Sequence, residues 1–172
     1  MLLNTHKLLR EQLLDIDGLN YVGWWANQIQ NIDEPVYHVP SVWLEYPAIQ
    51  PGTYPEGIQY AELDIVVRVM TEYVNEEQEE HLELHQELVD AVHRKLHQRT
   101  LMLSQLSSYS QLAGTSNDVA AINGLHRIGY QPDHEPTNTM ITVMTYRCNI
   151  VDISAVVELL AITPTVTVTR PT

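Results

Sequence analysis

Residues 60–74 read YAELDIVVRVMTEYV, and this stretch decides the fold. One alternate set of its side chains is apolar throughout: Ala61, Leu63, Ile65, Val67 and Val69. Because successive side chains of a β-strand point to opposite faces, the alternation predicts a strand with one fully apolar face. The other face begins with Glu62 and Asp64 and becomes apolar at Met70. We therefore expect that face to lie only partly in water, or to contact a partner.

The run that follows, residues 79–98, has the pattern of an amphipathic helix. Its apolar stripe consists of Leu84, Leu88, Val92 and Leu96, with Val89 beside them. Acidic residues lie mostly on the opposite side. A strand with one apolar face and a helix with one apolar stripe bury both by packing together, so we expect the rest of the fold to build on this pair.

Further elements are expected on both sides of this pair. A first helix is predicted over residues 2–16, and strands over 36–46, 125–130 and 139–152. The last strand has its expected core face at Met140, Met144, Tyr146, Cys148 and Ile150. The order of elements predicts the α+β class: an antiparallel sheet of about four strands with helices packed on one face.

The remaining segments are expected to be connections. Residues 19–35 should be irregular or form a short helix, and residues 46–58, with three prolines and two glycines, should form a long loop. Residues 99–124 are rich in Ser, Gln and Asn, with helical character only at 118–122. So long a connection is typical of a functional segment, or of one ordered against a partner.

The end of the sequence has a different character from the single domain expected over residues 1–152. Residues 153–172 are expected to form a C-terminal β arm, because Thr and Val alternate from 165 to 169. Two interpretations stay open: an extra strand on the domain's own sheet, or an arm that adds to the sheet edge of a neighbouring subunit. Candidate subunit or partner contacts are Val36, Tyr37, Tyr54, Val166 and Val168.

Charge excludes one class of function. The chain has 9 basic and 22 acidic residues among 172, for a net charge of −13. It lacks the basic patch that holds nucleic acid by neutralising phosphates, although it suits a surface past which nucleic acid slides. Charged residues make up only 18% of the chain, which suggests that other subunits cover part of the surface. No apolar run reaches the ~18 residues of a membrane span, and the N-terminus does not resemble a secretion signal.

Motifs for catalysis or metal binding are weak. His81 and His85 are four residues apart on the predicted helix, as are His93 and His97, a spacing that can place two imidazoles on one metal. The phrase HLELH differs from H-E-x-x-H, however, and no nucleophile or nucleotide motif is present. Cys148 lies in an apolar strand pattern and should be a buried small hydrophobe. We expect no catalytic residue, cofactor or metal, and a metal-dependent hydrolase is the least favoured interpretation.

Several phrases occur in a recognisable order. VWLEYPAI (42–49) and AELDIVVRVMTE (61–72) precede the helix HLELHQELVDAVHRKLH (81–97). GLHRIGYQPDHE (124–135) and MITVMTYRCNIVD (140–152) follow it. Over roughly residues 36–152, this order resembles the tail terminator, or tail-completion, proteins of tailed bacteriophages and prophages.

The resemblance implies a structural virion protein, assembled in the host cytoplasm and located at the head-proximal end of the tail. Such a protein forms a homohexameric ring that caps the tail tube protein and meets a head-completion or stopper protein, while DNA passes through the lumen without specific binding. Candidate lumen-facing acids are Glu62, Asp64, Glu76, Glu77, Glu79 and Glu80. The alternatives are another head–tail connector part, such as a stopper or tail-tube protein, or a non-viral peptide-binding or regulatory module.

Overall fold

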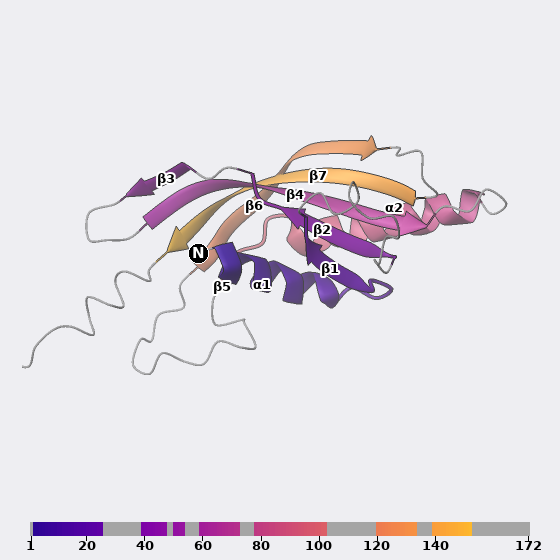
Figure 1. Cartoon of the computed structure of the whole chain (residues 1–172), viewed down its shortest axis with the longest axis horizontal. Helices are drawn as coiled ribbons and strands as arrows, with labels where there is room; N and C mark the ends of the chain where they lie inside the picture. The colour runs from indigo at the N-terminus through magenta and orange to yellow at the C-terminus, as the bar shows by residue number, and fades with distance from the viewer. Residues whose placement is uncertain are drawn as a thin grey trace, which may run out of the picture.

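The computed structural model describes residues 2–25, 39–47, 50–53, 59–72, 78–102, 120–133 and 139–152. Two helices and seven strands occur in these ranges (Figure 1). In chain order they are α1 (Leu2–Leu14), β1 (Tyr21–Trp24), β2 (Ser41–Glu45), β3 (Gln50–Thr53), β4 (Gln59–Glu72), α2 (Gln78–Leu96), β5 (Leu101–Met102), β6 (Ala120–Asp133) and β7 (Thr139–Asp152). The predicted α+β class is confirmed. Neither helix is long and apolar enough to cross a membrane.

The strands form one mixed sheet in the order β1-β2-β4-β7-β6-β5, with β3 also paired to β4. β1 runs parallel to β2, and the other pairs are antiparallel. The central pair is β4 and β7, which stay in register from Gln59 opposite Asp152 to Glu72 opposite Thr139. The predicted strand of residues 60–74 therefore is the middle of the sheet.

Both helices lie on the same side of the sheet (Figure 1). The β4 side chains predicted to be apolar and buried are buried, and so is the predicted core face of β7. Leucines of α1 and the stripe of α2 complete this main core, with Leu8, Leu9, Leu13, Leu88, Val89, Val92 and Leu96. Burial of this apolar area is the main force that holds the helices on the sheet.

One position of the predicted α2 stripe is wrong. Leu84 is 54% exposed, and His85 is buried in its place. Both positions lie one helical turn before Leu88 and Val89, so periodicity alone fits either one. His85 is accepted in the core because its ring nitrogens meet two hydroxyl groups, Thr71 Oγ1 at 2.7 Å and Thr142 Oγ1 at 2.8 Å.

Three predicted connections contain strands instead. β1 occupies part of residues 19–35, β3 part of residues 46–58, and β5 the start of residues 99–124. The segment 118–122 is not helical where the structure describes it, because β6 begins at Ala120. Strands β1, β3 and β5 have only two to four residues each. Pairing with a neighbouring strand, rather than the local sequence, stabilises strands this short. The predicted arm, 153–172, lies outside the described residues and stays a prediction.

Candidate functional site

The side of the sheet opposite the helices is called the helix-free face below. Directly paired residues of antiparallel strands share a face, so the register assigns its members on the three central strands. They are Ser41, Trp43 and Glu45 of β2, Glu62, Asp64, Val66, Arg68 and Met70 of β4, and Ile141, Val143, Thr145, Arg147 and Asn149 of β7. The face is charged at one end and aromatic at the other.

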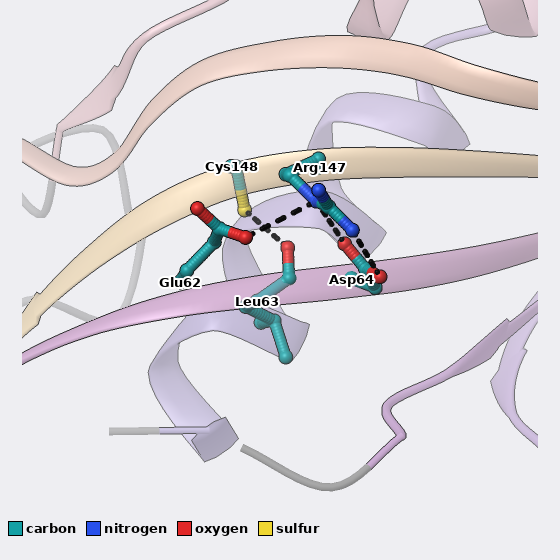
Figure 2. Close-up of polar contacts among 5 residues, drawn as sticks. All are labelled: Glu62, Leu63, Asp64, Arg147 and Cys148. Carbon is teal, nitrogen blue, oxygen red and sulfur yellow. Dashed lines mark hydrogen bonds and ion pairs between the residues drawn. The ribbon is translucent and has the colours of Figure 1, made fainter. Parts of the chain in front are cut away.

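At the charged end, one arginine contacts two of the predicted lumen acids, Glu62 and Asp64 (Figure 2). Arg147 Nε donates to Asp64 Oδ1 at 2.8 Å, and Nη2 donates to Asp64 Oδ2 at 3.1 Å. The same Nε lies 3.3 Å from Glu62 Oε1. The hydrogen bond from Arg147 lowers the pKa of Asp64, and the same hydrogen bond raises the pKa of Arg147. Two carboxylates and one guanidinium leave a single net negative charge here.

At the other end, Trp43, Met70 and Ile141 form a small second core, called the aromatic cluster, with Trp25 and Val143 partly buried against it. The guanidinium of Arg68 stacks over the Trp25 ring with Cζ 4.6 Å from the ring centroid. Arg68 also forms an ion pair with Glu45. A guanidinium held by a carboxylate and an aromatic ring is stiff, which suits a contact surface.

Strand β1 is the outermost strand on its side of the sheet among the described residues, and it presents two exposed aromatic rings. The Tyr21 ring packs 5.1 Å from the Trp43 ring, over Gly23. A Cβ at Gly23 would lie 2.5 Å from Tyr21 Cε1 and 2.9 Å from Trp43 Cζ3, so a side chain fits only if these rings move. Trp24 lies 4.7 Å from the Tyr46 ring. Exposed aromatic side chains at a sheet edge are typical of protein interfaces.

A groove of about 650 Å³ lies beside α2. Its lining residues come from α2, the end of β4, the turn after α1 and the segment before β2: Asp17, Gly18, Val39, Pro40, Thr71, Glu72, His81, Leu84, Glu87, Leu88, Asp90, Ala91 and Arg94. Four of these are carboxylates, against one arginine and one histidine. We call it the acidic groove. Leu84, which was wrongly predicted to lie in the buried stripe of α2, is exposed and lines this groove beside other apolar residues.

Of the four histidines singled out in the sequence, His85 and His93 lie within hydrogen-bond distance of hydroxyl groups, whereas Nδ1 of His97 is buried with no hydrogen-bond partner among the described residues. Both nitrogens of His85 face threonine hydroxyls, and burial lowers the pKa of this imidazole. His93 Nδ1 lies 2.9 Å from the Tyr146 hydroxyl, while His81 lines the acidic groove. Within the part of the chain that the structure describes, no three His, Cys, Asp or Glu residues are arranged to hold a metal ion.

Cys148 is buried in the main core, with Sγ 3.6 Å from the carbonyl oxygen of Leu63 (Figure 2). Burial raises the pKa of the thiol to about 12. A thiol is a nucleophile only as the thiolate, so this cysteine stays protonated and inert at neutral pH.

The structure describes only part of the predicted site. Glu62 and Asp64 lie together on the helix-free face, and Glu79 and Glu80 are exposed in the first turn of α2. The others lie outside the described residues: Val36, Tyr37, Tyr54, Glu76, Glu77, Val166 and Val168.

Sequence reasoning missed Arg147, Arg68 and Tyr21 as parts of the surface. A signal for Arg147 was available, because a cation and an acid on two paired strands are often placed opposite each other. No comparable signal existed for Tyr21, since the four-residue strand that carries it has no pattern of its own.

No protein-family model and no curated protein matches the chain. Among solved structures, it is similar to a chain described as "Virion of native gene transfer agent (GTA) particle". The superposition has a TM-score of 0.50 at 12% sequence identity, and covers 86% of this chain and 94% of that chain. At this identity the likeness shows a shared fold.

Proposed function

We propose that the chain is a structural virion protein of the tailed-phage kind, a tail terminator that assembles into a hexameric ring. The ring caps the tail tube protein and joins it to the head-side connector, and the chain performs no reaction. The observation that supports a virion structural protein is the fold shared with a chain of a gene transfer agent virion over 86% of one chain and 94% of the other. The terminator role and the ring are supported by the order of sequence motifs over residues 36–152, which resembles that of tail terminators.

The two borders of the sheet supply surfaces for ring closure. β1 presents Tyr21 and Trp24 at one border, while β6 presents Ile128, 52% exposed, and Tyr130, 47% exposed, near the other. Beyond Ile122, no described strand pairs with the outer edge of β6. A ring requires each subunit to use two different patches, because a head-to-tail contact repeats until the rotation closes. Two unlike apolar borders fit that requirement.

In this proposal, the charged end of the helix-free face lines the bore. Glu62 and Asp64 outnumber Arg147 there, and the net charge of −13 per chain gives the assembled ring a strongly negative field. Negative walls repel phosphates, so DNA passes without binding. Arg147 fixes the two carboxylates in position at the cost of one unit of charge.

Native mass spectrometry over a range of concentrations, together with purified tails, tests the ring. The expected particle has about six times the 19.7 kDa of one chain. A protein that is monomeric both free and in assembled particles would overturn the proposal. Open filaments would identify a tail-tube protein instead, because a tube continues to polymerise whereas a terminator stops at one ring.

A matched pair of substitutions sharpens this test. Tyr130→Glu should prevent ring formation while the free chain remains folded by circular dichroism. Leu82→Glu should leave the ring intact, because Leu82 is equally exposed, at 47%, but lies on α2 rather than on a border strand of the sheet. Equal effects of the two substitutions would remove β6 from the ring contact.

A further inference from the structure

The acidic groove is lined by both apolar and acidic side chains. Leu84, Leu88 and Ala91 of α2 supply apolar atoms, and Leu84 remains 54% exposed. Glu72 and Glu87 also line the groove, and no described cation forms an ion pair with either. Such a groove fits an extended segment that carries apolar side chains and a positive charge.

We propose that the acidic groove binds the C-terminal segment, residues 159–172, of a neighbouring copy of this chain. The proposal rests on the ring of the proposed function and names the contact that locks it. The segment reads LLAITPTVTVTRPT, and Arg170 is its only charged side chain. It also has the alternation of Thr and Val that favours an extended conformation.

Charge identifies this segment among all parts of the chain. Eight of the nine lysines and arginines lie in the described helices, strands and turns, where their positions are fixed. Arg170 is the one basic residue outside the described ranges. The segments adjoining the groove, 26–38 and 73–77, contain acids and no lysine or arginine, so they would meet the acidic side chains of the groove with repulsion.

The geometry favours a neighbouring copy over the segment's own domain. β7 ends at Asp152, opposite Gln59, whereas the groove lies at Glu72, opposite Thr139. These points are thirteen residue steps apart along the ladder, which is about 43 Å. To reach the groove of its own domain, the chain after β7 would have to span this distance, which would take up about two thirds of residues 153–172 as a connection. The groove of a neighbouring copy is not tied to the far end of this chain's own ladder, so binding there does not require that return.

Photo-crosslinking in the assembled full-length protein tests the contact. Leu84 is replaced by benzoylphenylalanine, isotope-light and isotope-heavy chains are mixed before assembly, and crosslinked peptides are identified by mass spectrometry. The expected crosslink joins position 84 of one copy to residues 153–172 of a copy of the other isotope. The same probe at Leu82, two residues earlier and outside the groove, should give at least about tenfold less of this product.

Each result of the crosslinking experiment either supports or overturns the proposed contact between the groove and the C-terminal segment. Rings that crosslink elsewhere, only within one copy, or not at all overturn this inference and leave the ring standing. A wild-type chain that forms no ring overturns both.

A charge exchange supplies a second, independent readout. Glu87→Arg should weaken ring formation about threefold or more, the size expected for a surface ion pair, and Arg170→Glu in the same chain should restore it. Glu83→Arg, exposed on α2 outside the groove, should have no such effect. A loss at Glu87 that Arg170→Glu fails to restore would contradict the predicted pairing.

Discussion

Nε2 of His85 lies 2.8 Å from Oγ1 of Thr142, a contact between α2 and β7 across 57 positions of the sequence. On its other side, Nδ1 of His85 lies 2.7 Å from Oγ1 of Thr71 on β4. One imidazole therefore links the helix to both central strands. In the neutral ring one nitrogen donates and the other accepts, and a threonine hydroxyl can serve either role.

Removing this link should destabilise the domain. His85→Ala leaves two buried hydroxyl groups without their partner and creates a cavity, so the free energy of unfolding should fall by about 2 kcal/mol or more. Urea denaturation measures the change. Glu83→Ala, exposed on the same helix, should change the unfolding free energy by less than about 0.5 kcal/mol. Equal effects of the two substitutions would show that the contacts of His85 do not stabilise the fold.

Stability should depend on pH through the same residue. Burial lowers the pKa of His85 in the folded state below its ordinary value of 6.5. The unfolded chain then binds the proton more readily, so stability is complete above about pH 6.5 and is lost as the pH falls below it. Unfolding free energies at about pH 7.5 and about pH 5.5 should differ less in His85→Gln than in the wild type.

A smaller slope should remain in that variant, because burial also lowers the pKa of His6 and His93. Asp64 and Asp15 do not contribute in this window, since their lowered pKa values place their effect at more acidic pH. An unchanged slope in His85→Gln would contradict the assignment.

Gly23 should not tolerate a side chain. Gly23→Ala places a Cβ against the rings of Tyr21 and Trp43, at distances of 2.5 and 2.9 Å before any shift. Displacing these rings should cost about 1–3 kcal/mol of unfolding free energy and change the tryptophan fluorescence. Gly129→Ala is the control, because its nearest contact would be 3.3 Å from Thr145 and should be milder. A neutral Gly23→Ala would mean that β1 packs differently.

Reversing the charge of the proposed bore should slow the passage of DNA. Glu62→Lys combined with Asp64→Lys leaves Arg147 beside two further cations, which attract phosphates instead of repelling them. Genome ejection from particles that carry the double variant should be slower, while circular dichroism shows a folded chain. Glu83→Lys, on the helix side of the sheet, should eject normally. Normal ejection by the double variant would remove both acids from the bore.

Sequence reasoning succeeded where one pattern dominated. The faces of β4 and β7 followed from alternation, because these strands bury one face over residues 61–71 and 140–150. It failed at β1, β3 and β5, whose two to four residues acquire their structure from a partner strand. β3 even contains Pro51 and Gly52, which locally favour a loop.

The candidate site was predictable only in part, for a similar reason. Glu62 and Asp64 were found because acids interrupt an apolar strand, but their partner Arg147 on β7 was not. The acidic groove was invisible, since it joins residues from four segments far apart in the sequence. The burial of His85 instead of Leu84 depends on contacts with the hydroxyl groups of Thr71 and Thr142. Helical periodicity carries no information about such contacts from other strands.

Electron microscopy of intact particles tests the central claim most directly. Gold-labelled antibody against this chain, or a cryo-reconstruction into which the described domain is fitted, locates the protein along the tail. The account predicts a single ring of six copies at the head-proximal end of the tail tube. Label along the whole tube, or no label on any particle, would contradict it.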